Sequence, residues 1–163
     1  MNRHSVDRKL AASRPLGYTF PRMARTLGLD LGGTRCGVAI DDELGTLAHP
    51  RPNLPARDRK ALVTEIAALA KREDVGRFVI GLPLEMSGDE GRAAERVRTF
   101  AQHLADASGL EVVLWDERLT TVQASAELRR AGLDARAQKD VIDAAAAVTI
   151  LQSYLDRKKK RRP

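Results

Sequence analysis

Residues 26–40 read TLGLDLGGTRCGVAI, and this stretch decides the fold. Its two apolar runs, 26–31 and 36–40, are typical of β-strands, and the paired glycines between them fit a tight turn. The short run 46–48 predicts a third strand, which the following prolines should stop because proline cannot donate to a β-ladder. We therefore expect an antiparallel meander of three strands, followed by a loop over 51–58.

Helix-like and strand-like patterns alternate after this meander. The expected elements are a helix at 58–73, a strand at 78–80, a helix near 93–109, a strand at 112–115, a helix from a capping box at 120–123 to Gly132, and a last helix at about 138–156. Residues 84–91 are glycine-containing and predict a flexible loop. The order of elements favours an α/β fold, with a mixed five-stranded sheet flanked by helices.

Length and composition exclude several classes of protein. The chain has 163 residues, of which 43% are hydrophobic and 31% charged, so it can bury a core and is not a disordered chain. No apolar stretch is long enough to span a membrane. The single cysteine, Cys36, excludes a disulfide framework and a cysteine zinc cage, and it is expected to be a small strand residue rather than a nucleophile.

The formal net charge of +6 is unevenly distributed. Residues 1–25 carry +5 and residues 157–162 carry +6, so the part between them carries −5. We expect a flexible basic arm at 1–24, one folded domain at 25–156 and a basic tail at 157–163. The basic ends fit either contact with nucleic acid or simple solvation. The arm lacks an apolar run of signal-peptide length, so a cytoplasmic location is expected.

Four acidic residues lie within or directly after apolar segments, where carboxylates are disfavoured. Asp30 stands inside an apolar strand, and Asp116 and Glu117 stand at the end of a buried strand, where α/β sheets place ligand sites. Asp143 is the only charged residue in 141–155. Burying a carboxylate without a partner is costly. Each acid taken singly is also explained by local hydrogen bonds, by solvation or by an ion pair with arginine.

Acids from three different elements nevertheless favour a shared cation. Carboxylate oxygens are hard ligands that suit Mg²⁺ or Mn²⁺. Such ions support phosphoryl chemistry by activating the attacking water and stabilising the leaving oxygen, with no histidine required. The fold must bring the acids together, which spacing alone does not show.

A competing interpretation concerns the glycine turn after Asp30. Asp30 followed by Gly32-Gly33-Thr34 is similar to the first phosphate loop of sugar kinases, whose backbone N–H groups bind phosphate. Those enzymes close two domains over a nucleotide. A chain of 163 residues provides only one such domain, which excludes a complete kinase.

Four blocks of sequence together carry a resemblance to a known family. They are residues 28–32 with Arg35 and Gly37, residues 79–84 with Gly88, residues 116–121, and residues 142–147 leading into 150–152. On these blocks the chain resembles the YqgF family, also described as pre-16S rRNA nucleases or RuvX-type resolvases. The resemblance covers about 26–156 and implies a ribonuclease H-like fold.

The resemblance also implies roles for individual residues. Asp30, Glu117 and Asp143 would be the catalytic, metal-binding acids. Asp116 stays a second candidate for the metal beside Glu117, because successive strand residues point to opposite faces. The residues expected to contact nucleic acid are Thr34, Arg35, Arg118, Thr120, Thr121 and Lys139. The two arginines fit phosphate, or alternatively they pair with the acids. Trp115 is expected to belong to the core, and the loop around 86–88 to cover the substrate.

Three functions follow as hypotheses. The first is a metal-dependent nuclease that trims the 5′ end of the 16S rRNA precursor, as the resemblance implies. The second is a Holliday junction resolvase with the same chemistry, which needs a dimer to cut both strands. The third is a non-catalytic RNA-binding assembly factor that uses the basic arms. The expected partners are RNA or branched DNA and no membrane, with the chain a monomer or a weak homodimer.

Overall fold

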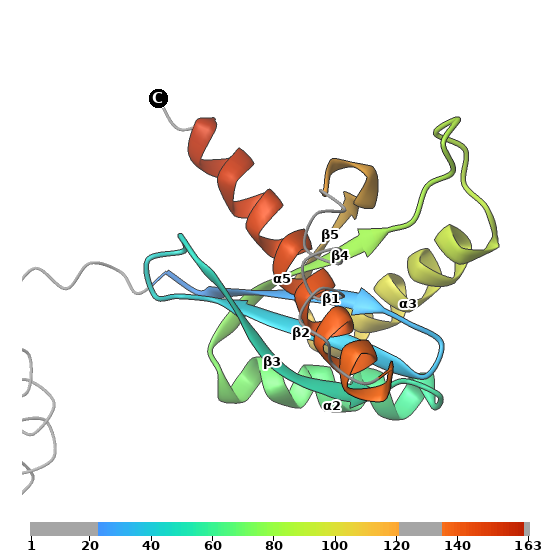
Figure 1. Cartoon of the computed structure of the whole chain (residues 1–163). Helices are drawn as coiled ribbons and strands as arrows, with labels where there is room; N and C mark the ends of the chain where they lie inside the picture. The colour runs from blue at the N-terminus through green and yellow to red at the C-terminus, as the bar shows by residue number, and fades with distance from the viewer. Residues whose placement is uncertain (1–22, 121–134, 162–163) are drawn as a thin grey trace, which may run out of the picture.

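The computed structural model describes residues 23–120 and 135–161, except for the side chains of 135–143. Its elements are β1 Arg25–Leu31, β2 Arg35–Asp41, β3 Ala48–Pro55, α2 Arg59–Arg72, β4 Val75–Leu82, α3 Arg92–Ser108, β5 Glu111–Asp116, the 3₁₀ turn η1 Glu117–Leu119, and α5 Ala135–Lys160. The sheet order is β3-β2-β1-β4-β5 (Figure 1). β1, β2 and β3 pair antiparallel, whereas β4 is parallel to both β1 and β5. The mixed five-stranded sheet is therefore confirmed.

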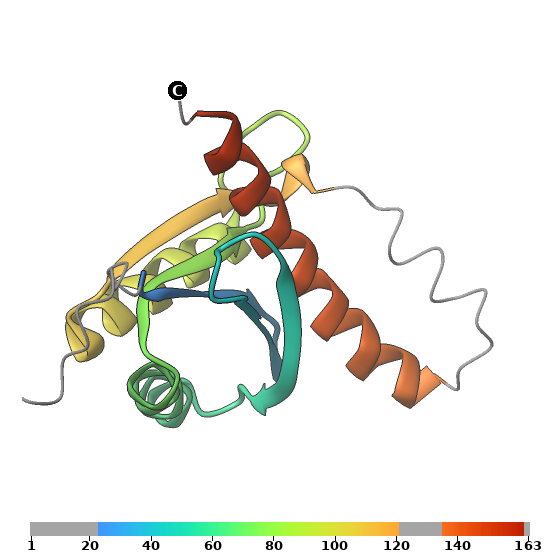
Figure 2. The ribbon, with the colours of Figure 1, turned by 90° about the vertical axis from the view of Figure 1, so that its left-hand side faces the viewer.

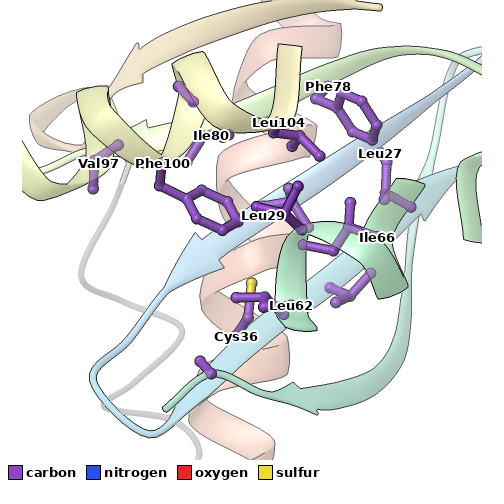
Figure 3. Packing of buried hydrophobic residues seen from close by; sticks show 14 of the residues in the cluster. Leu27, Leu29, Cys36, Leu62, Ile66, Phe78, Ile80, Val97, Phe100 and Leu104 are labelled. Atoms are coloured by element: carbon purple, nitrogen blue, oxygen red, sulfur yellow. The ribbon is translucent and has the colours of Figure 1, made fainter. Parts of the chain in front are cut away.

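Helices cover both faces of this sheet (Figures 1 and 2). Leu27 and Leu29 of β1 are fully buried on the face covered by α2 and α3, together with Phe78 of β4 and Leu104 of α3 (Figure 3). The alternate residues of the strands face α5 instead, because successive side chains point to opposite faces. Side chains of α5 make a second buried cluster there with Ala39 and Val79.

The helix α5 lies unusually close to the sheet at Gly28. A Cβ atom on Gly28 would lie 2.6 Å from Leu151 Cβ and 3.1 Å from the carbonyl oxygen of Ala147. Real side chains do not tolerate such contacts, so glycine at this position sets how closely α5 packs on β1. The chain thereby fixes α5 against the strand that carries Asp30.

The helices α2 and α3 agree with their predicted ranges, and local chemistry explains their ends. Asp58 caps α2 by accepting a hydrogen bond from the Ala61 amide at 3.0 Å. Gly109 ends α3 with a φ of 70°, in the left-handed region that favours glycine. No helix of the described residues has the length and hydropathy needed to cross a bilayer.

The predictions for the third strand and the following loop are wrong. β3 runs over Ala48–Pro55 and includes three prolines, although a short strand at 46–48 and a loop over 51–58 were expected. The physical reason is the position of β3 at the edge of the sheet, where it pairs only with β2. A proline whose missing N–H would face outward costs no ladder hydrogen bond. The β2–β3 register also shifts between Cys36 and Val38, and such an irregularity leaves local backbone groups without a ladder partner, which suits a strand that contains prolines.

The last helix is longer than predicted at both ends. α5 runs over Ala135–Lys160, so four residues of the expected basic tail continue the helix beyond Asp156. Positive charges near a helix C-terminus interact favourably with the helix dipole, which accounts for the extension. The expected helix between 120 and 132 lies almost wholly outside the described residues.

Candidate active site

Asp30 lies on the face of the sheet that is covered by α5. It shares this face with Gly28, two residues earlier on β1, because side chains alternate along a strand. Asp30 pairs with Gly37 of β2. The β1–β4 register, which pairs Leu29 with Ile80, places Asp30 next to Gly81 on the other side. Both strand neighbours of this carboxylate are therefore glycines, and neither places a side chain beside it.

Glu117 reaches the same place from the end of β5. A Cβ atom on Gly81 would lie only 2.7 Å from Glu117 Oε1 and 3.0 Å from Glu117 Cγ. The side chain of Glu117 therefore lies directly over Gly81, in space that any larger residue would fill. This contact brings a second carboxylate to the strand position beside Asp30.

The electrostatics of Glu117 reflect this arrangement. Burial, and next the charge of Asp30, raise the pKa of Glu117 to about 7, with a smaller contribution from Asp116. A carboxylate repelled by its neighbour and removed from water holds its proton more tightly. Perturbed carboxyl groups of this kind cluster at functional sites.

Asp116 is engaged elsewhere. Both of its carboxylate oxygens accept hydrogen bonds from the Arg118 guanidinium, at 2.7 to 3.1 Å, and Oδ1 also accepts from the Arg118 amide at 2.9 Å. These bonds lower the pKa of Asp116 and cap η1. Of the two adjacent acids, the structure thus places Glu117 against Asp30 and ties Asp116 to Arg118. The Arg118 side chain, expected to contact phosphate, remains 43% exposed while it holds Asp116.

Asp143 and Lys139 both lie on the N-terminal half of α5, and their side chains are outside the described residues. The backbone around Asp143 is informative. Ala147, one turn further along α5, is fully buried and contacts the position of Gly28 on β1. Among the described residues, no group of three or more histidine, cysteine or acidic side chains is arranged to hold a metal. Of the expected metal ligands, Asp30 and Glu117 are the two whose side chains lie close together in the described part of the chain.

The other expected nucleic-acid contacts fall in two places. Thr34 and Arg35 follow the tight β1–β2 turn, in which the Gly32 amide donates to the Arg35 carbonyl at 2.9 Å. Both line a mostly apolar groove between β3, the start of α2 and α5, which they share with Ala144. Thr120 has a structural role, since its hydroxyl donates to the Glu117 carbonyl at 2.6 Å and closes η1. Thr121 lies outside the described residues.

The place of Gly81 beneath the Glu117 side chain does not follow from the sequence, in which Gly81 is one residue of the block 79–84. The one available signal was a glycine directly after a buried apolar run, which often marks close approach of another group. What approaches could be identified only once the register between the strands was known.

Comparison with known proteins identifies the family of this chain. A family model described as "RuvX: Holliday junction resolvase" matches residues 24–157. A relative from Anaeromyxobacter sp. (strain Fw109-5), named "Putative pre-16S rRNA nuclease", is 46% identical over 132 residues, which cover 81% of this chain and 96% of that protein. A relative of the same name from Myxococcus xanthus (strain DK1622) is 44% identical, covering 81% of this chain and 87% of that protein.

A solved structure confirms the fold. The T. thermophilus RuvC in complex with Holliday junction substrate aligns with a TM-score of 0.55 at 12% identity, covering 85% of this chain and 98% of that chain. At this identity the similarity shows the fold alone. It confirms the expected ribonuclease H-like architecture. From the family model and the relatives together, the chain belongs to the RuvX family.

Proposed function

We propose that this protein is a metal-dependent nuclease that hydrolyses phosphodiester bonds in the cytoplasmic precursor of 16S rRNA. The observation that carries the proposal is the position of Glu117 over Gly81, beside Asp30, with a pKa raised to about 7. Two carboxylates that repel each other lower the stability of the fold, so binding of a ligand explains their proximity better than a structural role does. The names of the relatives support precursor rRNA as the substrate.

The donor set fits a divalent cation. Asp30 and Glu117 offer hard oxygen ligands, and their mutual repulsion is the kind that a bound cation relieves. We propose that Asp143, which lies one helical turn before the buried Ala147, is the third ligand. Bound Mg²⁺ or Mn²⁺ would lower the pKa of a water molecule and stabilise the charge that develops on phosphate.

The residues around the acids prepare the site for a phosphate. Gly37 and Gly81 keep the strand positions on both sides of Asp30 free of side chains. Arg118 offers exposed guanidinium N–H groups close to Glu117 in the chain. The loop between β4 and α3 closes with a bridge between Leu84 and Glu90, and its Gly88 approaches the Arg118 guanidinium. This loop is therefore positioned to contact a strand bound at Arg118.

The test is a cleavage assay with Mg²⁺, Mn²⁺ or EDTA. The substrates are a 16S precursor fragment that spans the mature 5′ end, a matched single-stranded DNA and a four-way DNA junction. Wild type should cut the RNA only with metal, and Asp30→Asn, Glu117→Gln and Asp143→Asn should each cut no more than the EDTA control. Asp106→Asn, at an exposed position near the C-terminal end of α3, is the matched control and should keep full activity. Metal-dependent cutting that survives in Asp30→Asn would refute the proposal.

A second candidate is a Holliday junction resolvase, which the description of the matching family model favours. Symmetric cutting of a junction requires two sites and hence a dimer. Preferred cutting of the junction, together with a dimer mass in light scattering, would support this function. A monomer that cuts only RNA would exclude it. Intact RNA binding with no cutting of any substrate would instead favour a non-catalytic assembly factor.

A further inference from the structure

The C-terminal end of α5 packs against the outer strand β5 through an aromatic cluster. Trp115, the only tryptophan of the chain, donates its indole N–H to Ser153 Oγ at 3.1 Å and meets the edge of Tyr154 at 5.5 Å between ring centroids. The Arg157 guanidinium lies over the Trp115 ring, 5.8 Å from its centroid. Arg77 donates to the Tyr154 hydroxyl at 2.9 Å and fixes that ring. This packing gives the exposed Arg157 a defined position.

The basic residues at this helix end divide between two sides. Lys159 donates to the carbonyl of Thr46 at 3.1 Å, and Lys158 and Lys159 both line a small pocket by the β2–β3 turn. Residues three positions apart share one side of a helix, so Lys160, the last residue of α5, continues the side that begins with Arg157. Arg161 follows in the closing turn, where its amide donates to the Lys158 carbonyl at 3.3 Å. In the described part of the chain, no ion pair involves these three residues.

Through Arg157, this second side adjoins Trp115 on β5. Trp115 pairs with Gly81, the residue over which Glu117 lies. From Asp30 on β1 to Trp115 on β5 the distance is two strand spacings, roughly 10 Å. That is the length of roughly three stacked nucleotides at about 3.4 Å each. The last turns of α5 project beyond the edge of the sheet (Figures 1 and 2).

We propose that Arg157, Lys160 and Arg161 form a phosphate-binding track for single-stranded RNA that leaves the active site across β5. The inference rests on the proposed nuclease function and extends it to the part of the substrate beyond the cleavage point. Three cations at this helix end can contact successive phosphates of a single strand. The Trp115 ring beneath Arg157 positions its guanidinium, whose N–H groups are suited to hydrogen bonds with phosphate. Trp115 is thus a positioning residue.

The test compares two double variants that remove the same charge from opposite sides of α5. In an Asp30→Asn background, which prevents cleavage, the affinity for a labelled 20-nucleotide single-stranded RNA is measured by anisotropy at a series of KCl concentrations. Removing two phosphate contacts should lower the slope of log K against log salt by about 1.4, because each contact contributes about 0.7 on a single strand. Arg157→Ala/Lys160→Ala should show this loss, and Lys158→Ala/Lys159→Ala should show a much smaller one. Equal effects of the two variants, or no effect of the first, would overturn the proposal.

Three further readouts distinguish a track from a general loss of charge. A trinucleotide spans roughly 10 Å at about 3.4 Å per nucleotide, which reaches from the site to Trp115 but not along the track. Its affinity should therefore change less in Arg157→Ala/Lys160→Ala than that of the long RNA. The fluorescence of Trp115 should change when the long RNA binds, and this change should be lost in the same variant. Trp115→Phe keeps a ring beneath Arg157 and should preserve the salt slope, whereas Trp115→Leu should lower it.

These binding results are independent of the proposed cleavage. Wild type that cuts no substrate would refute the nuclease while a difference between the two double variants would still support the track. Conversely, metal-dependent cutting with identical binding by both variants would support the nuclease and overturn the track.

Discussion

Replacing Glu117 with glutamine should stabilise the metal-free protein at pH 8 and leave its stability nearly unchanged at pH 4.5. The pKa of Glu117 is raised from 4.5 to about 7 in the folded chain, by burial first and then by Asp30. Between these pH values the folded state keeps a proton that the unfolded state releases, so the free energy of unfolding of wild type falls as pH rises. Above pH 7 the full cost is present. Glutamine is neutral and of the same size, so the variant avoids this cost.

The pKa shift and the burial of Glu117 set the expected change in the free energy of unfolding. A shift from 4.5 to about 7 corresponds to about 3 kcal/mol when the carboxylate is ionised. Glu117 is only half-buried, so water screens part of the repulsion. We therefore expect Glu117→Gln to raise the free energy of unfolding at pH 8 by about 1 to 3 kcal/mol.

Urea unfolding in EDTA at pH 4.5, 6 and 8, followed by circular dichroism, measures this difference. Glu65→Gln, on the exposed side of α2, is the control and should show no comparable pH dependence. Addition of Mn²⁺ at pH 8 should stabilise wild type and leave Glu117→Gln nearly unaffected, because ligand binding stabilises only a protein that retains its ligands. A variant that is less stable than wild type at pH 8, or a difference that does not vary with pH, would refute the reasoning.

Three substitutions test the packing of the fold, two of them beside the site and one between α5 and β3. Gly81→Ala adds a methyl group 2.7 Å from Glu117 Oε1, so it should lower stability by about 1 to 3 kcal/mol and abolish the Mn²⁺-dependent rise in melting temperature; an unchanged response to Mn²⁺ would contradict the placement of Glu117. Gly28→Ala meets an α5 side chain at 2.6 Å and should cost a similar amount in urea unfolding, and a neutral result would show that α5 is free to move away from β1. Gln152→Ala removes the side-chain oxygen that accepts from the Ala48 amide at 2.9 Å, so it should cost about 1 to 3 kcal/mol and speed hydrogen exchange at that amide. Unchanged exchange there would refute this link between α5 and β3.

The fold was largely predictable because most of its elements have the periodicity that their burial requires. β1 alternates buried leucines on one face with Gly28 and Asp30 on the other, and α2 presents Leu62 and Ile66 at helical spacing. β3 was not predictable in the same way. Its prolines are tolerated because β3 is an edge strand, and the sequence of a strand alone does not show whether it lies at the edge or in the centre of the sheet.

For the candidate site, the sequence indicates which acids to consider but not which of them lie side by side. Asp116 and Glu117 are adjacent, and strand alternation alone leaves open which one faces Asp30. The chain leaves the strand at this point, since Asp116 caps η1 and Glu117 begins it. The direction of each carboxylate therefore depends on the turn and on the Arg118 contact, which no periodicity encodes. The space over Gly81 likewise depends on the register between β4 and its neighbours.

Burial alone does not separate a site carboxylate from a structural one, and Asp41 shows why. Asp41 at the end of β2 is only 3% exposed, and its burial also raises its pKa. It accepts a hydrogen bond from the Thr26 amide at 2.8 Å and lies near Arg25, and both interactions favour its charged form. Its surroundings compensate the charge, so Asp41 joins β1 to β2 and needs no ligand. The largest charge acting on Glu117 is instead the like charge of Asp30. Two like charges held together, rather than one buried acid, distinguish the candidate site from Asp41.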